Sequence, residues 1–187
     1  MKIKNFLFIS LGLVMTFLSS CSDDPEPEIP NEEELITTLT YTLTPVGGGT
    51  TVELKFKDLD GDGGDDPEIT GGTLAANTTY EGSIELLNEL ESPAEDITEE
   101  VEEENDEHQF FYQTTVNGLS VAYDDIDGDG NPVGLATKVA TTTAGSGKLT
   151  VTLRHEPNKT ADGVKDGDIT NAGGETDIEV TFDVEVK

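Results

Sequence analysis

Apolar and polar residues alternate along most of this chain, and this period of two is the feature that most limits its fold. The alternation is clearest near the C-terminal end, where single residues separate Ile178, Val180, Phe182, Val184 and Val186. Successive side chains of a β-strand point to opposite faces, so one row packs against a core and the other meets solvent. Strands of this kind are typical of antiparallel sheets with one buried face.

Seven earlier segments are also expected to be strands, and short turns rich in glycine separate several of them, as at 45–49 and 144–147. The predicted strands cover residues 35–43, 52–56, a segment through Ile84 and Leu86, 108–113, 118–123, 135–143 and 149–153. We therefore predict an all-β protein: an immunoglobulin- or fibronectin-III-like antiparallel β-sandwich of about eight strands, in a single domain over residues 35–187.

One predicted corner carries a resemblance of its own. Leu74-Ala75-Ala76-Asn77-Thr78-Thr79-Tyr80 resembles the tyrosine corner of fibronectin type III and related sandwich domains, although Ala76 stands where proline is usual. The resemblance implies that the Tyr80 hydroxyl bonds to upstream backbone and has a structural role.

A single acidic helix interrupts the strand pattern. Ser92-Pro93-Ala94-Glu95 has the form of a capping box with proline at the first helical position, and a nearly unbroken run of acids follows. Ile97 and Val101 are four residues apart, which predicts a thin apolar stripe resting on the sheet.

The N-terminal residues indicate an exported protein. A short basic start precedes an apolar run, Phe6 to Leu18, that suits a signal peptide and is too short to span a bilayer. Leu18-Ser19-Ser20-Cys21 resembles a lipobox, and Cys21 is the sole cysteine of the chain. We expect residues 1–20 to be a lipoprotein signal peptide, with lipid attached to Cys21. The alternative is an ordinary secretory signal that ends in an unrelated cysteine.

Residues 21–34 are predicted to form a lipidated, acidic, proline-rich linker. Ser22-Asp23-Asp24 resembles the acidic export tag of surface-exposed lipoproteins of the Bacteroidota, which implies an outer-membrane protein that faces outward. A solvated acidic linker without that role is the alternative.

The charge of the chain limits its partners. Removal of the signal peptide leaves eight basic and forty acidic residues, a formal charge of −32. Such a surface repels nucleic acid and anionic lipid headgroups, so we expect membrane attachment through the lipid on Cys21 alone. Cations are the natural counterpart.

Two aspartate- and glycine-rich loops are candidates for calcium. Each resembles the first half of an EF-hand loop, but Ile69 and Ala136 stand where the bidentate glutamate would be. The candidate ligands are Asp58, Asp60, Asp62 and Asp66 in the first loop, and Asp125, Asp127, Asp129 and Asn131 in the second. The alternative is a polar turn whose aspartates accept backbone hydrogen bonds.

The two histidines suggest a second kind of metal site. His108 begins one predicted strand and His155 ends another, with Glu104 one helical turn before His108 and Glu156 next to His155. If the two strands are neighbours, these four side chains could bind zinc or another divalent transition metal. Independent polar histidines are the alternative.

Enzyme chemistry finds no support in the sequence. It has no cysteine nucleophile in the mature chain besides Cys21, no serine in a Gly-x-Ser-x-Gly setting and no glycine-rich phosphate loop before a helix. We expect a protein that is not an enzyme.

Three segments, 31–39, 154–159 and 173–178, resemble a family of small acidic Bacteroidota lipoproteins, and the likeness extends over nearly the whole mature chain. That family often carries the label "type 1 periplasmic-binding fold", an α/β architecture that disagrees with the strand pattern. The resemblance implies an accessory to a TonB-dependent outer-membrane transporter, and the expected function is binding of a divalent metal or a cationic ligand. The alternative is a non-catalytic structural or interaction subunit of an outer-membrane assembly, with loops stabilised by calcium.

Overall fold

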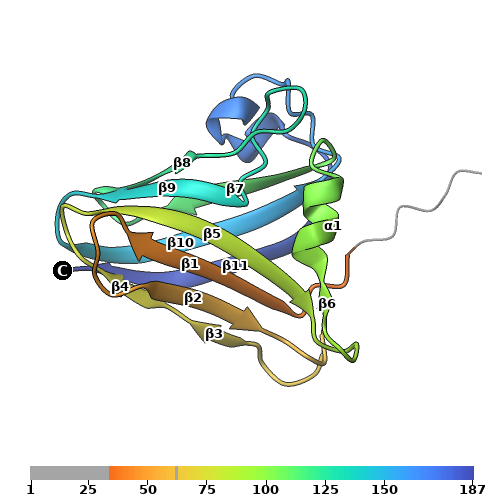
Figure 1. The fold of residues 1–187 in the computed structure, drawn as a ribbon, viewed down its shortest axis with the longest axis horizontal. Helices are drawn as coiled ribbons and strands as arrows, with labels where there is room; N and C mark the ends of the chain where they lie inside the picture. The colour runs from red at the N-terminus through yellow and green to blue at the C-terminus, as the bar shows by residue number, and fades with distance from the viewer. Residues whose placement is uncertain (1–33, 62) are drawn as a thin grey trace, which may run out of the picture. The chain divides into compact units, whose positions relative to one another are not determined.

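The computed structural model describes residues 34–61 and 63–187, which lie in one unit that begins at Glu32. Two antiparallel-dominated sheets face each other, and a short helix lies at one end (Figure 1). The all-β sandwich is therefore confirmed. The predicted signal peptide, Cys21 and Asp62 lie outside the described residues.

The first sheet has the strand order β3-β2-β1-β5-β9-β8, and the two-residue strand β6 pairs with the end of β5. Its strands are β1 (Thr38–Pro45), β2 (Val52–Lys57), β3 (Glu68–Thr70), β5 (Thr79–Asn88), β6 (Glu95–Asp96), β8 (Leu119–Tyr123) and β9 (Ala136–Thr141). The described pairings within it are antiparallel.

The second sheet has the order β4-β11-β10-β7. Its strands are β4 (Gly72–Leu74), β7 (His108–Thr114), β10 (Gly145–His155) and β11 (Glu175–Val186). β10 pairs antiparallel with both β11 and β7, and the short β4 runs parallel to β11. The short strands β3, β4 and β6 were not predicted, because two or three residues are too few to show a periodic pattern.

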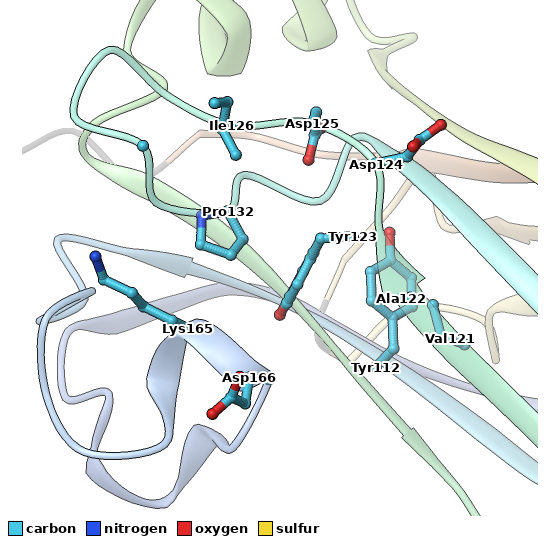
Figure 2. Close-up of a pocket in the computed structure, with 12 residues that line it drawn as sticks. Tyr112, Val121, Ala122, Tyr123, Asp124, Asp125, Ile126, Pro132, Lys165 and Asp166 are labelled. Carbon is cyan, nitrogen blue, oxygen red and sulfur yellow. The ribbon is translucent and has the colours of Figure 1, made fainter.

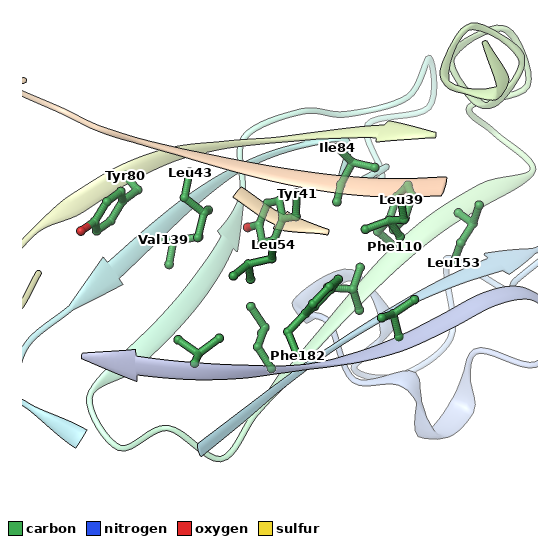
Figure 3. Close-up of a cluster of buried hydrophobic side chains, with 14 of the residues drawn as sticks. Leu39, Tyr41, Leu43, Leu54, Tyr80, Ile84, Phe110, Val139, Leu153 and Phe182 are labelled. Carbon is green, nitrogen blue, oxygen red and sulfur yellow. The ribbon is translucent and has the colours of Figure 1, made fainter. Parts of the chain in front are cut away.

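The core fills the space between the two sheets. Alternate residues of the long strands point inward, as in β11, where Ile178, Val180, Phe182, Val184 and Val186 are all buried. Figure 3 shows Phe182 facing Leu54 and Tyr41 of the opposite sheet, and Phe110 near Leu39. Burial of these apolar surfaces is the main term that holds the two sheets together.

The helix α1 (Ile97–Glu103) begins later than the sequence predicted. Ser92 and Pro93 lie in a turn before β6, and the N-cap is Asp96, whose side chain accepts a hydrogen bond from the Thr98 N–H at 3.0 Å. The expected apolar stripe is confirmed, because Ile97 and Val101 are buried against the sheet. No helix among the described residues is long and apolar enough to cross a membrane.

The polar segment between β10 and β11 contains two short 3-10 helices, η1 (Val164–Asp166) and η2 (Ile169–Asn171). Phe111, Val164 and Ala172 form a small second core beneath it. This cluster was not predicted, since Val164 and Ala172 stand singly in a polar segment.

The tyrosine corner is present. The Ala75 N–H donates a hydrogen bond of 2.8 Å to the hydroxyl of Tyr80, and the Tyr80 side chain is buried. Tyr80 therefore has the structural role that the corner resemblance implied.

Removal of this hydroxyl should weaken the fold without disturbing its packing. We expect Tyr80→Phe to lower the free energy of unfolding by about 1 kcal/mol, since the Ala75 N–H loses its partner. Urea unfolding measures the change, and Thr79→Val, which removes an exposed neighbouring hydroxyl, should stay within about 0.5 kcal/mol of wild type. Equal effects of the two variants would contradict the role of the corner.

Candidate metal centre

The two histidines of the chain lie side by side. His108 begins β7, His155 ends β10, and the antiparallel register of these strands makes the two residues direct partners. The ring centroids are 4.5 Å apart with the planes at 64°. Both side chains are buried. The sequence alone predicted a shared site only if these two strands were neighbours. The structure shows that they are neighbours.

Two carboxylates complete the cluster. A carboxylate oxygen of Glu34 lies 2.9 Å from Nε2 of His108, and its other oxygen lies 3.6 Å from Nδ1 of His155. Asp177 Oδ2 lies 3.7 Å from Nε2 of His108. The ligand atoms of these four residues all lie within 4.8 Å of one another, and each side chain is at most 4% exposed. We call Glu34, His108, His155 and Asp177 the inner cluster.

The inner cluster differs from the predicted ligand set in its carboxylates. Glu104 was predicted as a ligand, but its side chain is exposed and lies outside the cluster. Glu156 is also exposed and lies outside the inner cluster, although it joins a second group around His155. Glu34 was assigned to the acidic linker of residues 21–34, yet its side chain is buried between the histidines.

Asp177 reaches the cluster through a β-bulge. In the β10–β11 pairing, Leu153 is opposite Ile178 and Arg154 is opposite Thr176, so Asp177 is the extra residue between them. A bulge redirects a side chain that regular alternation would send to the other face. Asp177 and its neighbour Ile178 are therefore both turned away from solvent. A single sequence cannot reveal such a bulge.

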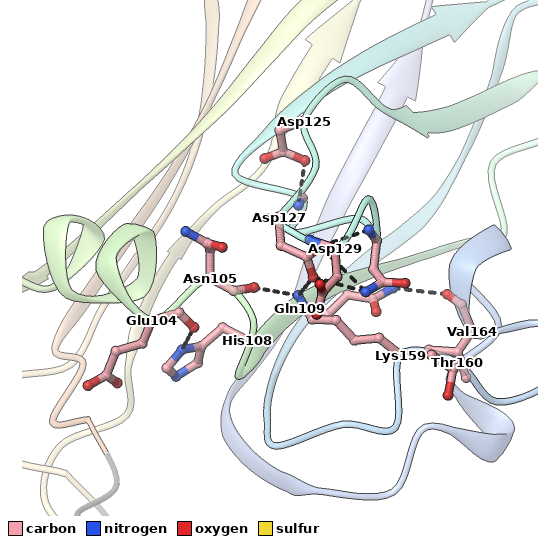
Figure 4. Close-up of polar contacts among 12 residues, drawn as sticks. Glu104, Asn105, His108, Gln109, Asp125, Asp127, Asp129, Lys159, Thr160 and Val164 are labelled. Carbon is pink, nitrogen blue, oxygen red and sulfur yellow. Dashed lines mark hydrogen bonds and ion pairs between the residues drawn. The ribbon is translucent and has the colours of Figure 1, made fainter.

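A backbone contact orients the His108 ring. Nδ1 of His108 lies 3.1 Å from the carbonyl oxygen of Glu104, at the end of α1 (Figure 4). A carbonyl can only accept, so Nδ1 carries the proton, and in the neutral ring the lone pair is on Nε2, which faces Glu34 and Asp177. Metal-binding histidines typically donate their other ring N–H to a carbonyl or carboxylate oxygen in this way.

Glu34 and His108 shift each other's titration. Burial alone would lower the pKa of His108, but the bond and charge of Glu34 outweigh it and raise that pKa above its ordinary value. Burial alone would raise the pKa of Glu34, but the contact with His108 lowers it. Both pKa shifts favour a protonated His108 imidazole paired with an ionised Glu34 carboxylate when no metal is bound.

The donor set fits a divalent transition metal. Two imidazole nitrogens and two carboxylate oxygens are ligands of zinc and similar ions, for which four-coordinate sites are usual. Both ring nitrogens of His155 and Oε2 of Glu34 are buried and have no hydrogen-bond partner. Buried polar atoms in that condition are costly, and a bound cation would satisfy them. The inner cluster could therefore hold a metal ion.

Two aspartates of the second loop accept hydrogen bonds from the protein itself. Asp125 accepts from the N–H groups of Gly134 at 2.7 Å and Ala136 at 2.8 Å. Oδ1 of Asp127 accepts from the N–H groups of Asp129 and Asn131, at 3.0 Å and 2.8 Å. These contacts match the polar-turn alternative.

A buried lysine lies beside one carboxylate of this loop. Lys159 is buried, and its ammonium lies 3.0 Å from Oδ2 of Asp127 and donates to the carbonyl of Asn105 (Figure 4). Burial by itself would raise the pKa of Asp127, but bonds from Asn131 and Lys159 together lower it. The positive charge beside Asp127 is thus supplied by the protein itself.

The first aspartate loop shows similar local bonds among its described residues. Asp58 accepts from the N–H groups of Asp60 and Gly61, at 3.2 Å and 2.9 Å, and Asp60 accepts from that of Asp65 at 2.9 Å. Within residues 34–61 and 63–187, the groups of acids and histidines that converge closely enough for a metal lie at the strand ends and outside these loops. Calcium in either loop stays a prediction.

A separate pocket of about 690 Å³ lies between β8, the loop after it and η1. Figure 2 shows the rings of Tyr112 and Tyr123 on one side and Lys165 and Asp166 on the other. The Tyr123 hydroxyl donates to the carbonyl of Phe110 at 2.7 Å, that of Tyr112 donates to the carbonyl of Gly134, and burial raises the pKa of Tyr123 to about 12. Both hydroxyls are therefore committed to the fold, and no member of the inner cluster lines this pocket.

Comparison with known proteins adds little. No protein-family model and no curated protein matches the sequence. Among solved structures, the chain is similar to domains 4 and 5 of the S-layer protein SbsC, with 12% sequence identity, a TM-score of 0.25 and coverage of 78% of this chain and 75% of that one. A likeness at that level carries no argument about function.

Loss of Lys159 should destabilise the protein strongly. We expect Lys159→Met to cost about 3–5 kcal/mol of unfolding free energy, because the buried Asp127 carboxylate loses its positive partner. The matched control is Lys138→Met, whose partner Asp124 is well exposed, with an expected cost below about 1 kcal/mol. Similar losses in urea unfolding for the two variants would show that Asp127 does not depend on Lys159.

The Glu34–His108 pair should make the metal-free protein less stable as the pH rises. The raised pKa of His108 contributes stability that is complete below about pH 6.5 and is lost as the pH rises through the folded-state pKa. The lowered pKa of Glu34 contributes above its ordinary value of 4.5 and is lost as the pH falls through its own folded-state pKa. The free energy of unfolding of wild type, measured in urea, should therefore exceed that of His108→Gln most between about pH 4.5 and 6.5. An advantage that grows toward pH 9 would contradict the assignment.

Proposed function

We propose that this protein binds a divalent transition metal, with zinc as the type case, at Glu34, His108, His155 and Asp177. The observation that carries the proposal is the buried His108–His155 pair, with Nε2 of His108 turned toward two carboxylates by the Glu104 carbonyl. At metal sites, a histidine ring is usually held by a hydrogen bond from one nitrogen while its other nitrogen binds the metal.

The charge of the inner cluster supports a bound cation. Two buried carboxylates lie beside two imidazoles in a place of low exposure. Isolated buried charge is costly unless it is paired. A divalent ion held by these four ligands would pair with both carboxylates.

The closed surroundings indicate retention of the ion. Four protein ligands at most 4% exposed leave little room for a substrate or several waters. Closed four-ligand sites are typical of structural zinc, whereas catalytic sites keep an open position. The proposal is therefore a binding protein, and it agrees with the expectation that the chain is not an enzyme.

The proposed setting is the outer membrane. The lipobox-like sequence at Cys21 supports a lipid anchor, and the acidic residues after it support export to the surface. A role beside a TonB-dependent transporter rests on the family resemblance alone. The competing function is a structural or interaction subunit, for which the exposed acidic residues of α1, Glu99, Glu102 and Glu103, offer a docking face.

Titration calorimetry of the metal-stripped protein tests the metal proposal. We expect micromolar or tighter zinc binding at neutral pH and weaker calcium binding, because imidazole suits zinc and not calcium. Binding should weaken below about pH 6, where protons compete for the imidazoles. The zinc affinity of His108→Ala/His155→Ala should fall by more than the roughly 10–100-fold lost when only a hydrogen-bond partner of a metal ligand is removed.

Asp177→Asn serves as a second variant, since it keeps the shape of the side chain and removes a charged ligand. It should also weaken zinc binding while circular dichroism stays that of a folded β-protein. Absence of any zinc affinity tighter than about millimolar in the wild type would exclude the metal proposal. A stable protein partner that survives the histidine double variant would favour the interaction subunit.

A further inference from the structure

The His155 ring faces carboxylates on two sides. Its Nδ1 points into the inner cluster, 3.6 Å from Glu34, and its Nε2 lies 3.7 Å from Oε2 of Glu107. The side chain is only 4% exposed, and neither nitrogen has a hydrogen-bond partner. The inner cluster needs one of these nitrogens and leaves Nε2 unexplained.

Glu107 and Glu156 lie on that outer side. Ligand atoms of Glu107, His155 and Glu156 all lie within 4.8 Å of one another, a spacing that a single ion could bridge. Both acids are exposed, in contrast to the inner cluster. We propose that these three residues form a second metal site, open to solvent, which shares His155 with the inner cluster. The proposal rests on the proposed metal-binding function and extends it to a second ion.

The backbone holds the two acids together. The Glu156 N–H donates a hydrogen bond of 2.6 Å to the carbonyl of Glu107, which joins the end of β10 to the start of β7. Glu156 adopts a left-handed conformation with φ of 48°, rare for a residue other than glycine. Gly174 packs beneath this turn so closely that a Cβ there would lie 2.1 Å from the carbonyl oxygen of His155. The position of Glu156 is therefore set by the fold.

The outer site would have three protein ligands, and water can supply the rest. Sites with an open position exchange ligands more readily than closed ones. An ion held by Glu107, Glu156 and Nε2 is separated from the inner cluster by one imidazole ring. The outer site is thus the solvent-facing one of the two.

Occupancy of both sites has a defined proton balance. Neutral His155 has one ring proton, so it can bind a single ion through its other nitrogen. When the second ion binds, the remaining ring proton leaves to solvent and the imidazolate bridges the two metals. The Nε2 proton of the metal-free His108 leaves to solvent when the inner ion binds. Water bound to each ion is exchanged for protein ligands, and no electron is transferred.

The stoichiometry of zinc binding tests the second site. The metal-stripped full-length protein should take up two equivalents at neutral pH, the second more weakly than the first. Glu107→Gln/Glu156→Gln should bind one equivalent with the first affinity unchanged. The matched control is Glu102→Gln/Glu103→Gln, which removes two exposed acids of α1 and should keep two equivalents.

The outcomes separate this inference from the function on which it rests. A single equivalent in the wild type, unchanged by Glu107→Gln/Glu156→Gln, would exclude the outer site and leave the inner one. No zinc binding at all would exclude both.

Copper(II) provides a readout of the shared ring. Two copper ions bridged by the His155 imidazolate should couple, so the electron paramagnetic resonance intensity should fall below that expected for two isolated ions. The glutamine pair should restore the signal of one uncoupled copper. Additive signals from two coppers in the wild type would overturn the bridge.

Discussion

The antiparallel pairing of β7 with β10 is the interaction on which the candidate site depends. This register makes His108 and His155 direct partners at one end of the second sheet, where the apolar rows of both strands give way to polar residues. The register itself is set by the buried residues further along, such as Phe110 opposite Leu153. A shift by one residue would turn each inward side chain outward, so the same burial that stabilises the sandwich also holds the two imidazoles together.

The two sheets both contribute to the inner cluster. His108, His155 and Asp177 belong to strands of the second sheet, whereas Glu34 precedes β1 of the first. The cluster therefore joins the segment that enters the domain to the sheet across the core. An ion bound there would cross-link distant parts of the chain. It would stabilise the folded state to the extent that it binds the folded chain more tightly than the unfolded chain.

Buried aspartates of this very acidic protein are compensated in two different ways. In the loop around Asp127, a buried lysine and backbone N–H groups satisfy the carboxylate. In the inner cluster, Glu34 and Asp177 lie 2.9 Å and 3.7 Å from Nε2 of His108. The Asp127 carboxylate is thus paired within the protein, while the inner cluster has a donor set that suits a bound cation.

The local pattern of the sequence determined much of the fold. Period-two alternation was enough to predict the long strands and the all-β sandwich, because it depends only on neighbouring residues and on which face they bury. The buried stripe of α1 and the tyrosine corner were also visible locally. Tertiary structure decided the candidate site: the register that pairs His108 with His155, the bulge that turns Asp177 inward, and the burial of Glu34 at the edge of an acidic segment. It also decided that Glu104 contributes a carbonyl and Lys159 an ammonium. These features depend on contacts between residues far apart in the chain, and the residues concerned have no distinguishing pattern around them.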